Sequence, residues 1–192
     1  MTDSFSIDTT KTALVVIDLQ KGIAAGVTEP HASADVVKNA AALAAAFRAK
    51  KMPVFLVRVT PSADGKDGLS PSADNAMKFS ARSADWADIV PEMRQAPDDF
   101  VITKRQWGAF YGTELDLQLR RRNIDTIVLC GISTNVGVES TARDAYERGY
   151  NQIFAEDAAA ARSAQEHTHS MQGIFTRIGR VRTTKEILSA LQ

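Results

Sequence analysis

The chain of 192 residues is long enough to form one domain with a substantial core, and its 44% hydrophobic and 24% charged residues are ordinary for a globular protein. Lys plus Arg and Asp plus Glu each number 23, so the formal net charge is +0. This balance argues against a nucleic-acid-binding protein, which normally has a basic excess, and gives no support for binding to a membrane surface. No apolar run approaches the roughly 20 residues needed to span a bilayer.

The cysteine content and the start of the chain indicate a cellular compartment. Residues 1–11 are polar and lack the apolar core of a secretory signal. The single cysteine, Cys130, excludes an internal disulfide framework and fits a reducing environment. We therefore expect a cytoplasmic protein.

Short apolar, β-branched segments alternate with longer amphipathic ones, a pattern typical of βαβ units on a parallel sheet. The first half is predicted to hold a strand over 13–17 that ends at Asp18, a helix over 34–50 and a strand over 54–59. The first strand is continuously apolar, as expected when helices cover both of its faces. The polar stretch 60–98, with a helical turn within 84–93, is too long for an ordinary loop, and we interpret it as an excursion over the site.

The second half continues the alternation. Thr113 is expected to cap a helix, with Asp116 in the Glu/Gln position of a capping box. The predicted elements are a strand over 100–103 that ends at Lys104, a loop over 105–112, the helix after Thr113, a strand over 126–130, a helix over about 136–148 stopped by Gly149, a strand over 153–155, a helix from Ser163, a short strand near Val181 and a helix from Thr184.

Polar residues follow the predicted strands, where open parallel sheets bind their ligands. They are Asp18, Lys104, Ser133-Thr134-Asn135 and Asp157. We expect the fold to gather them on one edge, where a carboxylate and an ammonium in a partly dry pocket shift each other's pKa values. From spacing alone, the alternative that Asp18 only caps the next segment and Lys104 is a solvated strand end stays open.

Three blocks of the sequence resemble the motif blocks of the isochorismatase-like hydrolases. They cover 13–20, 102–113 and 130–145, in the order and spacing of that family along nearly the whole chain. The resemblance implies one domain over 1–192 with a three-layer α/β/α fold, built on a six-stranded, mostly parallel, Rossmann-like sheet. It also implies a small-molecule substrate and a homo-oligomer, either a dimer or larger.

Most members of this family use an Asp, a Lys and a Cys, and the resemblance carries Asp18 and Lys104 onto the first two roles. The family cysteine aligns with Gly137. Cys130 lies in a predicted strand, where we expect it to be buried and inert, so thioester chemistry is not expected. True isochorismatases of the family also lack the cysteine and hydrolyse a vinyl ether without a covalent intermediate.

We therefore predict a cofactor-free hydrolase of a small, carboxylated metabolite. Asp18 would be the acid, Lys104 its electrostatic partner, and Gly137 would mark the place of the missing thiol. Burial would have to raise the pKa of Asp18 for this chemistry. Two alternatives stay open: a catalytically silent binding member of the family, and an amidase that uses activated water.

Further residues are predicted to contact the substrate or to bind its anionic groups through their backbone amides. They are Gln20, Trp107, Phe110, Tyr111, Ile132, Ser133, Thr134, Asn135 and Val136. For the three aromatic residues, packing against the neighbouring helix is an equal alternative. Family members often have a cis peptide at the position of Ile132–Ser133.

The histidines give no metal pattern. His167 and His169 are two residues apart and would point in different directions on a helix. His31 stands alone in a loop, and the stretch 58–64 has no counterpart of the family's nicotinamidase-type metal ligands. We therefore expect no metal.

Overall fold

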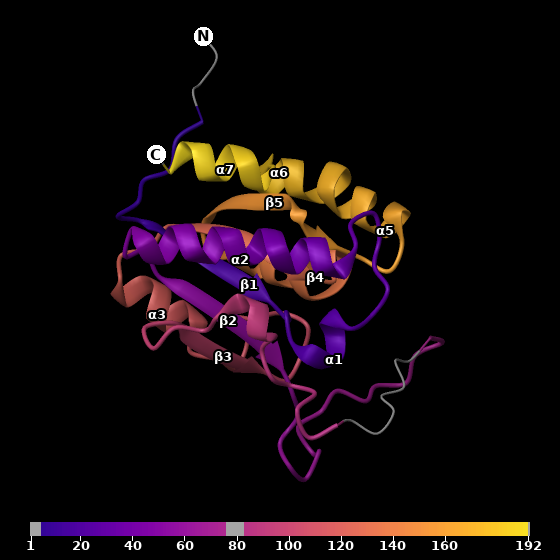
Figure 1. The fold of residues 1–192 in the computed structure, drawn as a ribbon. Helices are drawn as coiled ribbons and strands as arrows, with labels where there is room; N and C mark the ends of the chain where they lie inside the picture. Colours follow the sequence, from indigo (N-terminus) through magenta and orange to yellow (C-terminus); the bar gives the residue numbers. More distant parts are fainter. Residues whose placement is uncertain (1–4, 76–82, 192) are drawn as a thin grey trace.

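The computed structural model describes residues 5–75 and 83–191, and these residues form one six-stranded sheet (Figure 1). The strands are β1 (Thr12–Ile17), β2 (Val54–Val59), β3 (Phe100–Lys104), β4 (Thr126–Ile132), β5 (Asn151–Ala160) and β6 (Arg180–Arg182). Their order is β3-β2-β1-β4-β5-β6, and every neighbouring pair is parallel. The predicted six-stranded α/β fold is confirmed, with a sheet that is parallel throughout.

Helical segments cover both faces of the sheet. They are α1 (Lys21–Ala24), α2 (Ser33–Ala49), η1 (Pro91–Met93), α3 (Leu115–Arg121), η2 (Thr134–Val138), α4 (Glu139–Glu147), α5 (Ala164–Thr168), η3 (His169–Phe175), α6 (Thr176–Ile178) and α7 (Thr184–Ala190). Leu14 and Val16 of β1 pack with α2 and α7, whereas Val15 and Ile17 pack with α3 and α4. Alternate side chains of one strand thus enter two cores, which explains the continuous apolar runs and the three layers.

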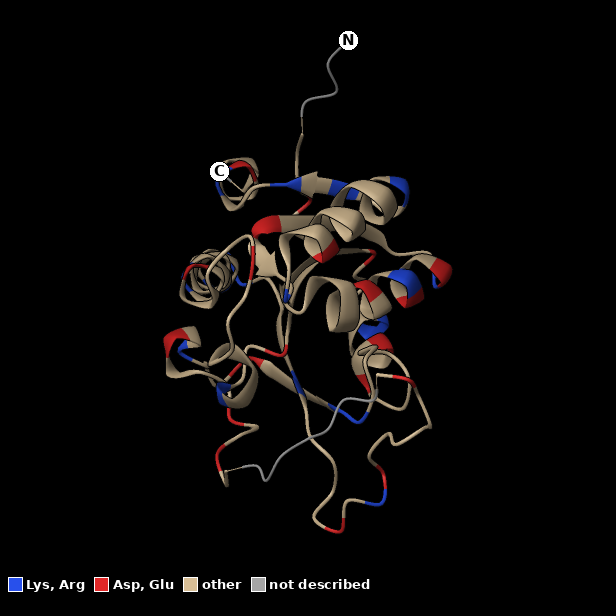
Figure 2. Cartoon of the chain, turned by 90° about the vertical axis from the view of Figure 1, so that its right-hand side faces the viewer, with Lys and Arg blue, Asp and Glu red and all other residues tan. Residues whose placement is uncertain are grey.

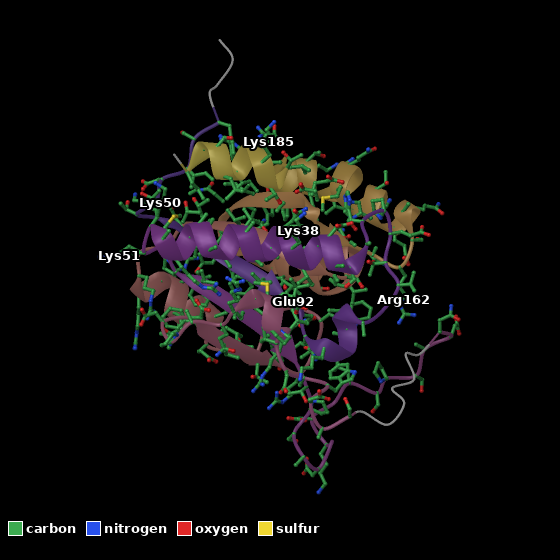
Figure 3. All side chains as sticks on the ribbon, viewed as in Figure 1. Lys38, Lys50, Lys51, Glu92, Arg162 and Lys185 are labelled. Carbon is green, nitrogen blue, oxygen red and sulfur yellow. The ribbon has the colours of Figure 1, made fainter. Side chains whose placement is uncertain are left out.

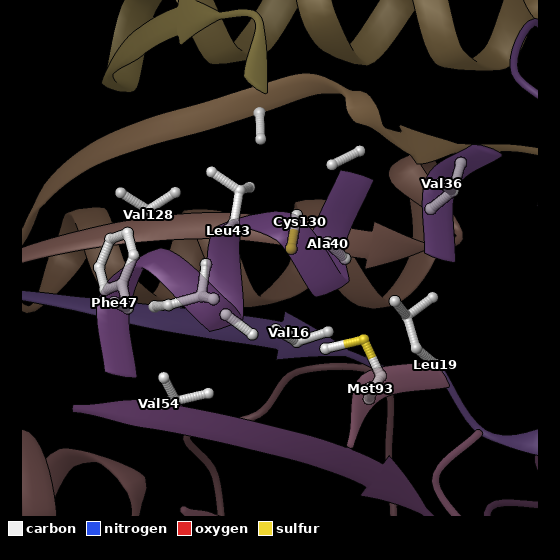
Figure 4. Close-up of a cluster of buried hydrophobic side chains, with 14 of the residues drawn as sticks. Val16, Leu19, Val36, Ala40, Leu43, Phe47, Val54, Met93, Val128 and Cys130 are labelled. Carbon is white, nitrogen blue, oxygen red and sulfur yellow. The ribbon is translucent and has the colours of Figure 1, made fainter. Parts of the chain in front are cut away.

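Cys130 belongs to the core between the sheet and α2. Figure 4 shows it among Val16, Ala40 and Leu43, all fully or almost fully buried. Burial raises the pKa of the Cys130 thiol to about 12. The thiol is therefore protonated at physiological pH and enclosed by apolar side chains.

The direction of the strand order reverses between β1 and β4. From β1 the chain proceeds to β2 and β3 on one side, and it then crosses to β4, β5 and β6 on the other. In open parallel sheets, ligands bind outside the carboxyl ends of the strands at such a switch point. Asp18 directly follows β1, and η2 begins two residues after β4.

β5 is longer than the predicted strand over 153–155, and it contains a bulge. Leu129 pairs with Phe154, but Gly131 pairs with Ala159, so β5 accommodates extra residues between these two positions. Such bulges redirect side chains. Asp157 therefore lies inside β5 and not at its end, and its carboxylate accepts hydrogen bonds from the Thr184 amide (2.6 Å) and hydroxyl (2.7 Å). The expectation that Asp157 joins the site is wrong, because it holds the start of α7.

The capping box predicted at Thr113 is also wrong. The helix α3 begins at Leu115, and the Thr113 hydroxyl accepts a hydrogen bond from the Leu115 amide at 3.1 Å. Asp116 instead accepts a hydrogen bond from the Tyr150 hydroxyl at 2.8 Å. Capping boxes that the sequence reading did not assign occur at Ser163 with Glu166 and at Thr183 with Glu186. The predicted helix over 136–148 is η2 followed by α4, and Gly149 ends it with φ +79°.

The polar stretch 60–98 has two described arms, residues 60–75 and 83–98, and both pack beside the residues that follow Asp18 and Lys104. In one arm, the Trp86 carbonyl accepts a hydrogen bond from the Gly22 amide at 2.9 Å. In the other arm, the Thr60 carbonyl accepts one from Arg105 at 2.6 Å. The turn predicted within 84–93 corresponds to η1 and the bends before it, while residues 76–82 lie outside the described part of the chain.

Charged residues of both signs interleave on the outer helices (Figure 2). The labelled side chains in Figure 3, Lys38, Lys50, Lys51, Glu92, Arg162 and Lys185, are all exposed. Within residues 5–75 and 83–191, no helix is both long enough and apolar enough to cross a membrane.

Candidate active site

The first site residue, Asp18, sits at a backbone position that few side chains adopt. Its φ is +54°, in the left-handed region, where Asp is among the better tolerated residues. The Asp18 amide donates to the Val57 carbonyl at 2.9 Å, which extends the ladder between β1 and β2 by one residue. The change of backbone direction after β1 leaves the carboxyl group buried, with 5% of the residue exposed.

The second site residue, Lys104, is the last residue of β3 and is only 1% exposed. Its Nζ lies 2.8 Å from Oδ2 of Asp18 and donates a hydrogen bond to the Trp107 carbonyl at 2.5 Å. β3 is two strands away from β1 in the sheet, so the long lysine side chain bridges the distance. The structure thus brings together the two charged residues that the sequence placed at strand ends, and Lys104 is not a solvated strand end.

Burial dominates the electrostatics of this pair. It raises the pKa of Asp18 from 3.8 to about 6, although the neighbouring Lys104 ammonium pulls the pKa in the opposite direction. Oδ1 of Asp18 is buried and has no hydrogen-bond partner among the residues that the structure describes. A carboxyl group with one unused buried oxygen and a pKa near neutrality can hold or release a proton during a reaction.

Gly137 faces the same two groups. A Cβ atom on Gly137 would lie 3.1 Å from Oδ2 of Asp18 and 3.2 Å from Nζ of Lys104. It would also lie 2.9 Å from a methyl carbon of Ile17. The α-carbon of Gly137 therefore borders the charged pair at close range, and any side chain here would crowd it.

The segment that carries Gly137 is held by hydrogen bonds within its own turn and to His167. The Ile132–Ser133 peptide is cis, and the Val136 amide donates to the Ser133 carbonyl at 3.2 Å, so that amide is not free to bind a ligand. Thr134 is fully buried, with its hydroxyl 2.9 Å from Nδ1 of His167. Asn135 belongs to the same turn, η2.

The four remaining predicted contact residues separate into different environments. Gln20 is fully buried, and its amide group bonds to the backbone of Val59 and to the Trp86 carbonyl, which occupies both ends of the side chain. Phe110 is buried in the core with its ring 5.7 Å from that of Tyr150, as the packing alternative predicts. Tyr111 is 76% exposed, and Trp107 is half exposed. The hydrogen bonds of Gln20 and the core packing of Phe110 argue against direct contact of either side chain with a substrate.

One cluster of polar side chains was missed by the sequence reading. Nε2 of His31 lies 2.9 Å from Oε1 of Glu156, and Nε2 of His167 lies 3.3 Å from the same oxygen. The description of His31 as isolated is therefore wrong. No local pattern could reveal this cluster, because the loop of His31 reaches β5 only through tertiary contacts.

Comparison with known proteins fits this geometry. The family model described as "Isochorismatase domain" matches residues 12–186. The chain belongs to the isochorismatase family. This isochorismatase-family hydrolase is 54% identical to the family protein YecD of Escherichia coli O157:H7, covering 94% of this chain and 96% of that protein. The structure of an isochorismatase family protein from Burkholderia thailandensis is 44% identical, covers 97% of both chains and superposes with a TM-score of 0.93.

More distant relatives of this isochorismatase-family chain include amidohydrolases. The ureidoacrylate amidohydrolase of Variovorax paradoxus is 31% identical over 81% of this chain and 71% of its own length. The N-carbamoylsarcosine amidase of Thermoplasma acidophilum is 30% identical, covers 91% of this chain and 96% of its own, and has a TM-score of 0.74. The family therefore accommodates amide hydrolysis on this fold.

Proposed function

We propose that this hydrolase acts on a small, carboxylated metabolite by acid catalysis, without a cysteine nucleophile. The observation that carries the proposal is the buried Asp18 carboxyl group, whose pKa is raised to about 6 and whose Oδ1 has no partner in the described chain. A carboxyl group with such a pKa keeps a substantial protonated fraction at weakly acidic pH, and it can then donate its proton to a substrate.

The reaction would begin when Asp18 transfers its proton to the terminal carbon of an enol ether, which produces an oxocarbenium ion and the Asp18 carboxylate. Water then adds to the oxocarbenium carbon, and its proton returns to Asp18. The resulting hemiketal separates into a carbonyl compound and an alcohol. The ammonium of Lys104, 2.8 Å from Oδ2, stabilises the carboxylate that forms in the first step.

Lys104 also has the capacity to bind the carboxylate of the substrate. An ammonium carries three N–H donors, and its contacts with Asp18 and with the Trp107 carbonyl use two of them. The third donor and the positive charge favour an anionic substrate group. This preference supports a carboxylated metabolite as the substrate class.

Gly137 supports the noncovalent mechanism. We infer that it stands where most family members have their nucleophilic cysteine, because a Cβ here would approach both Asp18 and Lys104. Cys130 cannot replace that thiol, since it is fully buried in the opposite core and its pKa is raised to about 12. Without a thiol beside the pair, water remains as the attacking group.

An amidase that uses activated water is the second candidate, favoured by the two amidohydrolases among the relatives. In that reaction Asp18 would be a base that accepts a proton from water, and its ionised form would be the active one. A catalytically silent binding protein is the third candidate, although binding alone does not require a buried Asp–Lys pair.

The test is a substrate screen at high enzyme concentration with isochorismate, simple enol ethers, ureidoacrylate and N-carbamoyl amino acids. We expect enol-ether turnover by the unaltered chain and its loss in Asp18→Asn, while Asp98→Asn, a change at an exposed residue, keeps full activity. Turnover of amides only would favour the second candidate. Ligand-induced thermal stabilisation without any turnover would favour the third.

The resemblance also implies a homo-oligomer, and we propose a dimer or larger assembly. Light scattering coupled to size-exclusion chromatography tests this directly. A mass of one chain, 20.8 kDa, would contradict it.

A further inference from the structure

Three side chains of metal-binding types meet outside the Asp18–Lys104 pair. His31 comes from the loop between α1 and α2, Glu156 from β5 and His167 from α5. One ligand atom from each residue lies within 4.8 Å of the other two. Both imidazoles direct Nε2 at the same carboxylate oxygen, with separations of 2.9 and 3.3 Å.

The backbone holds each of these residues in place. The loop of His31 is fixed to the end of β5 by a pair of hydrogen bonds between Glu29 and Ala161, both 2.9 Å, and Figure 1 shows this loop beside α5. The bulge in β5 allows Glu156 to face the loop while Asp157 faces α7. The convergence therefore follows from strand pairing and not from the chance position of a mobile side chain.

We propose that His31, Glu156 and His167 form a binding site for a divalent transition-metal ion, with Zn²⁺ as the first choice. Zinc is bound by histidine nitrogen and carboxylate oxygen at about 2.0–2.2 Å, which in a tetrahedral site separates the ligand atoms by about 3.3 Å. The two nitrogen–oxygen separations are close to this value. Two histidines and a carboxylate leave a fourth position for water or another ligand, and His31 and Glu156 are partly exposed, so that position is reachable from solvent.

The surroundings of His167 suit a metal ligand. The residue is 2% exposed, and its other ring nitrogen, Nδ1, lies 2.9 Å from the Thr134 hydroxyl. When Nε2 binds a metal, the ring proton resides on Nδ1 and can be donated to that hydroxyl, an arrangement that orients many metal-binding histidines. Glu156 adds an anionic oxygen to the two neutral imidazole nitrogens, a combination of ligands that zinc accepts.

The metal proposal does not depend on the proposed catalytic chemistry, although Thr134 links His167 to the turn that carries Gly137. The competing explanation is a metal-free clasp, in which Glu156 accepts hydrogen bonds from both imidazoles and only fastens the loop to β5. The two explanations differ in their response to added metal, because a clasp has no affinity for Zn²⁺.

The experiment uses the full chain without a histidine tag, after treatment with a chelator. Zn²⁺ binding is measured by calorimetric titration, and Co²⁺ binding by its visible absorption. We expect one ion per chain and a higher melting temperature with metal. Glu156→Gln and His31→Gln should each weaken binding by at least about 100-fold, and Thr134→Val by about 10-fold, as loss of an orienting partner does.

His169→Gln is the matched control, since His169 is exposed and lies two residues beyond His167. It should bind metal like the unaltered chain, and circular dichroism should show native folding in every variant. Failure of the unaltered chain to bind one equivalent would overturn the proposal. Equal binding by the unaltered chain and by both His31→Gln and Glu156→Gln would also overturn it, by placing the ion elsewhere.

Discussion

Asp18 and Lys104 form an ion pair, 2.8 Å from Oδ2 to Nζ, in which both side chains are almost completely removed from solvent. Removing two charges from water costs several kcal/mol for each ion, and the attraction between them offsets only part of that cost. The part of this cost that is not offset disfavours the charged carboxylate, so the pKa of Asp18 is raised to about 6. The protonation state of Asp18 therefore changes close to physiological pH, and several measurable consequences follow.

The pH dependence of catalysis distinguishes the acid mechanism from the base mechanism. If Asp18 donates a proton, kcat/KM is highest below the pKa of about 6 and falls as the pH rises through it. If Asp18 accepts a proton from water, kcat/KM rises through the same pH. We expect the falling profile on an enol-ether substrate, measured from about pH 4 to about pH 8. A rising profile would remove Asp18 from the role of acid.

The same shift makes folding stability depend on pH. The folded pKa of Asp18 lies above its ordinary value of 3.8, so the group stabilises the fold fully below 3.8, and this contribution is lost as the pH rises through about 6. The loss amounts to about 3 kcal/mol. The side chain introduced by Asp18→Asn cannot titrate. The free energy of unfolding of Asp18→Asn minus that of the unaltered chain should therefore increase by about this amount between about pH 4 and about pH 7. Urea unfolding at several pH values measures the difference, and a constant difference would contradict the raised pKa.

Replacement of Lys104 tests the direction of its influence. Its ammonium lowers the pKa of Asp18 against the effect of burial, so Lys104→Met should raise that pKa further above 6. Carbon-13 NMR of labelled aspartate carboxyl groups reports the titration without a substrate. Lys38→Met, which changes an exposed lysine on α2, should leave the titration unchanged. A lower pKa of Asp18 in Lys104→Met would mean that the ammonium does not stabilise the carboxylate.

The sequence led to this pair but not to the histidine cluster. Asp18 and Lys104 both end predicted strands, and the carboxyl ends of parallel strands share one edge, so strand prediction places them on one edge, while the family resemblance is what gave them a shared role. His31 and Glu156 are 125 residues apart, and their contact requires a strand bulge and a loop pairing that have no local pattern. Tertiary contacts of this kind are not contained in hydrophobic periodicity.

The direction of side chains within loops likewise could not be predicted from the sequence. Phe110 and Tyr111 are adjacent aromatic residues, yet Phe110 is 3% exposed with its ring tilted against that of Tyr150, whereas Tyr111 is 76% exposed. Their loop has no regular period that would assign either face. The fold class, by contrast, follows from continuous apolar strands whose two faces are both covered.

The crowding around Gly137 predicts a local cost for any side chain. A Cβ would lie 2.9 to 3.2 Å from Ile17, Asp18 and Lys104, closer than ordinary contact. We expect Gly137→Ala to lower the free energy of unfolding by about 1–3 kcal/mol, as overpacking does. Gly173→Ala is the matched control, because a Cβ there meets no atom closer than 3.9 Å. Equal effects of the two substitutions would show that Gly137 is not closely packed against the pair.

Placing a thiol beside the pair is the most direct probe of the chemistry that this scaffold supports. A sulfur on residue 137 would sit next to the Asp18 carboxylate, which can take its proton, and to the Lys104 ammonium, which stabilises the thiolate. We expect Gly137→Cys to gain hydrolysis of N-carbamoyl amides, measured as ammonia release, and to be inactivated by iodoacetamide. Gly137→Ala should gain nothing, because it adds the Cβ without the sulfur. The native Cys130 should stay unmodified in the folded chain and react only after unfolding, as its burial and raised pKa require. Labelling of Cys130 at the rate of an exposed thiol would show that it is not inert. A Gly137→Cys thiol that is alkylated without any amide turnover would show that Asp18 and Lys104 alone do not make this site an amidase.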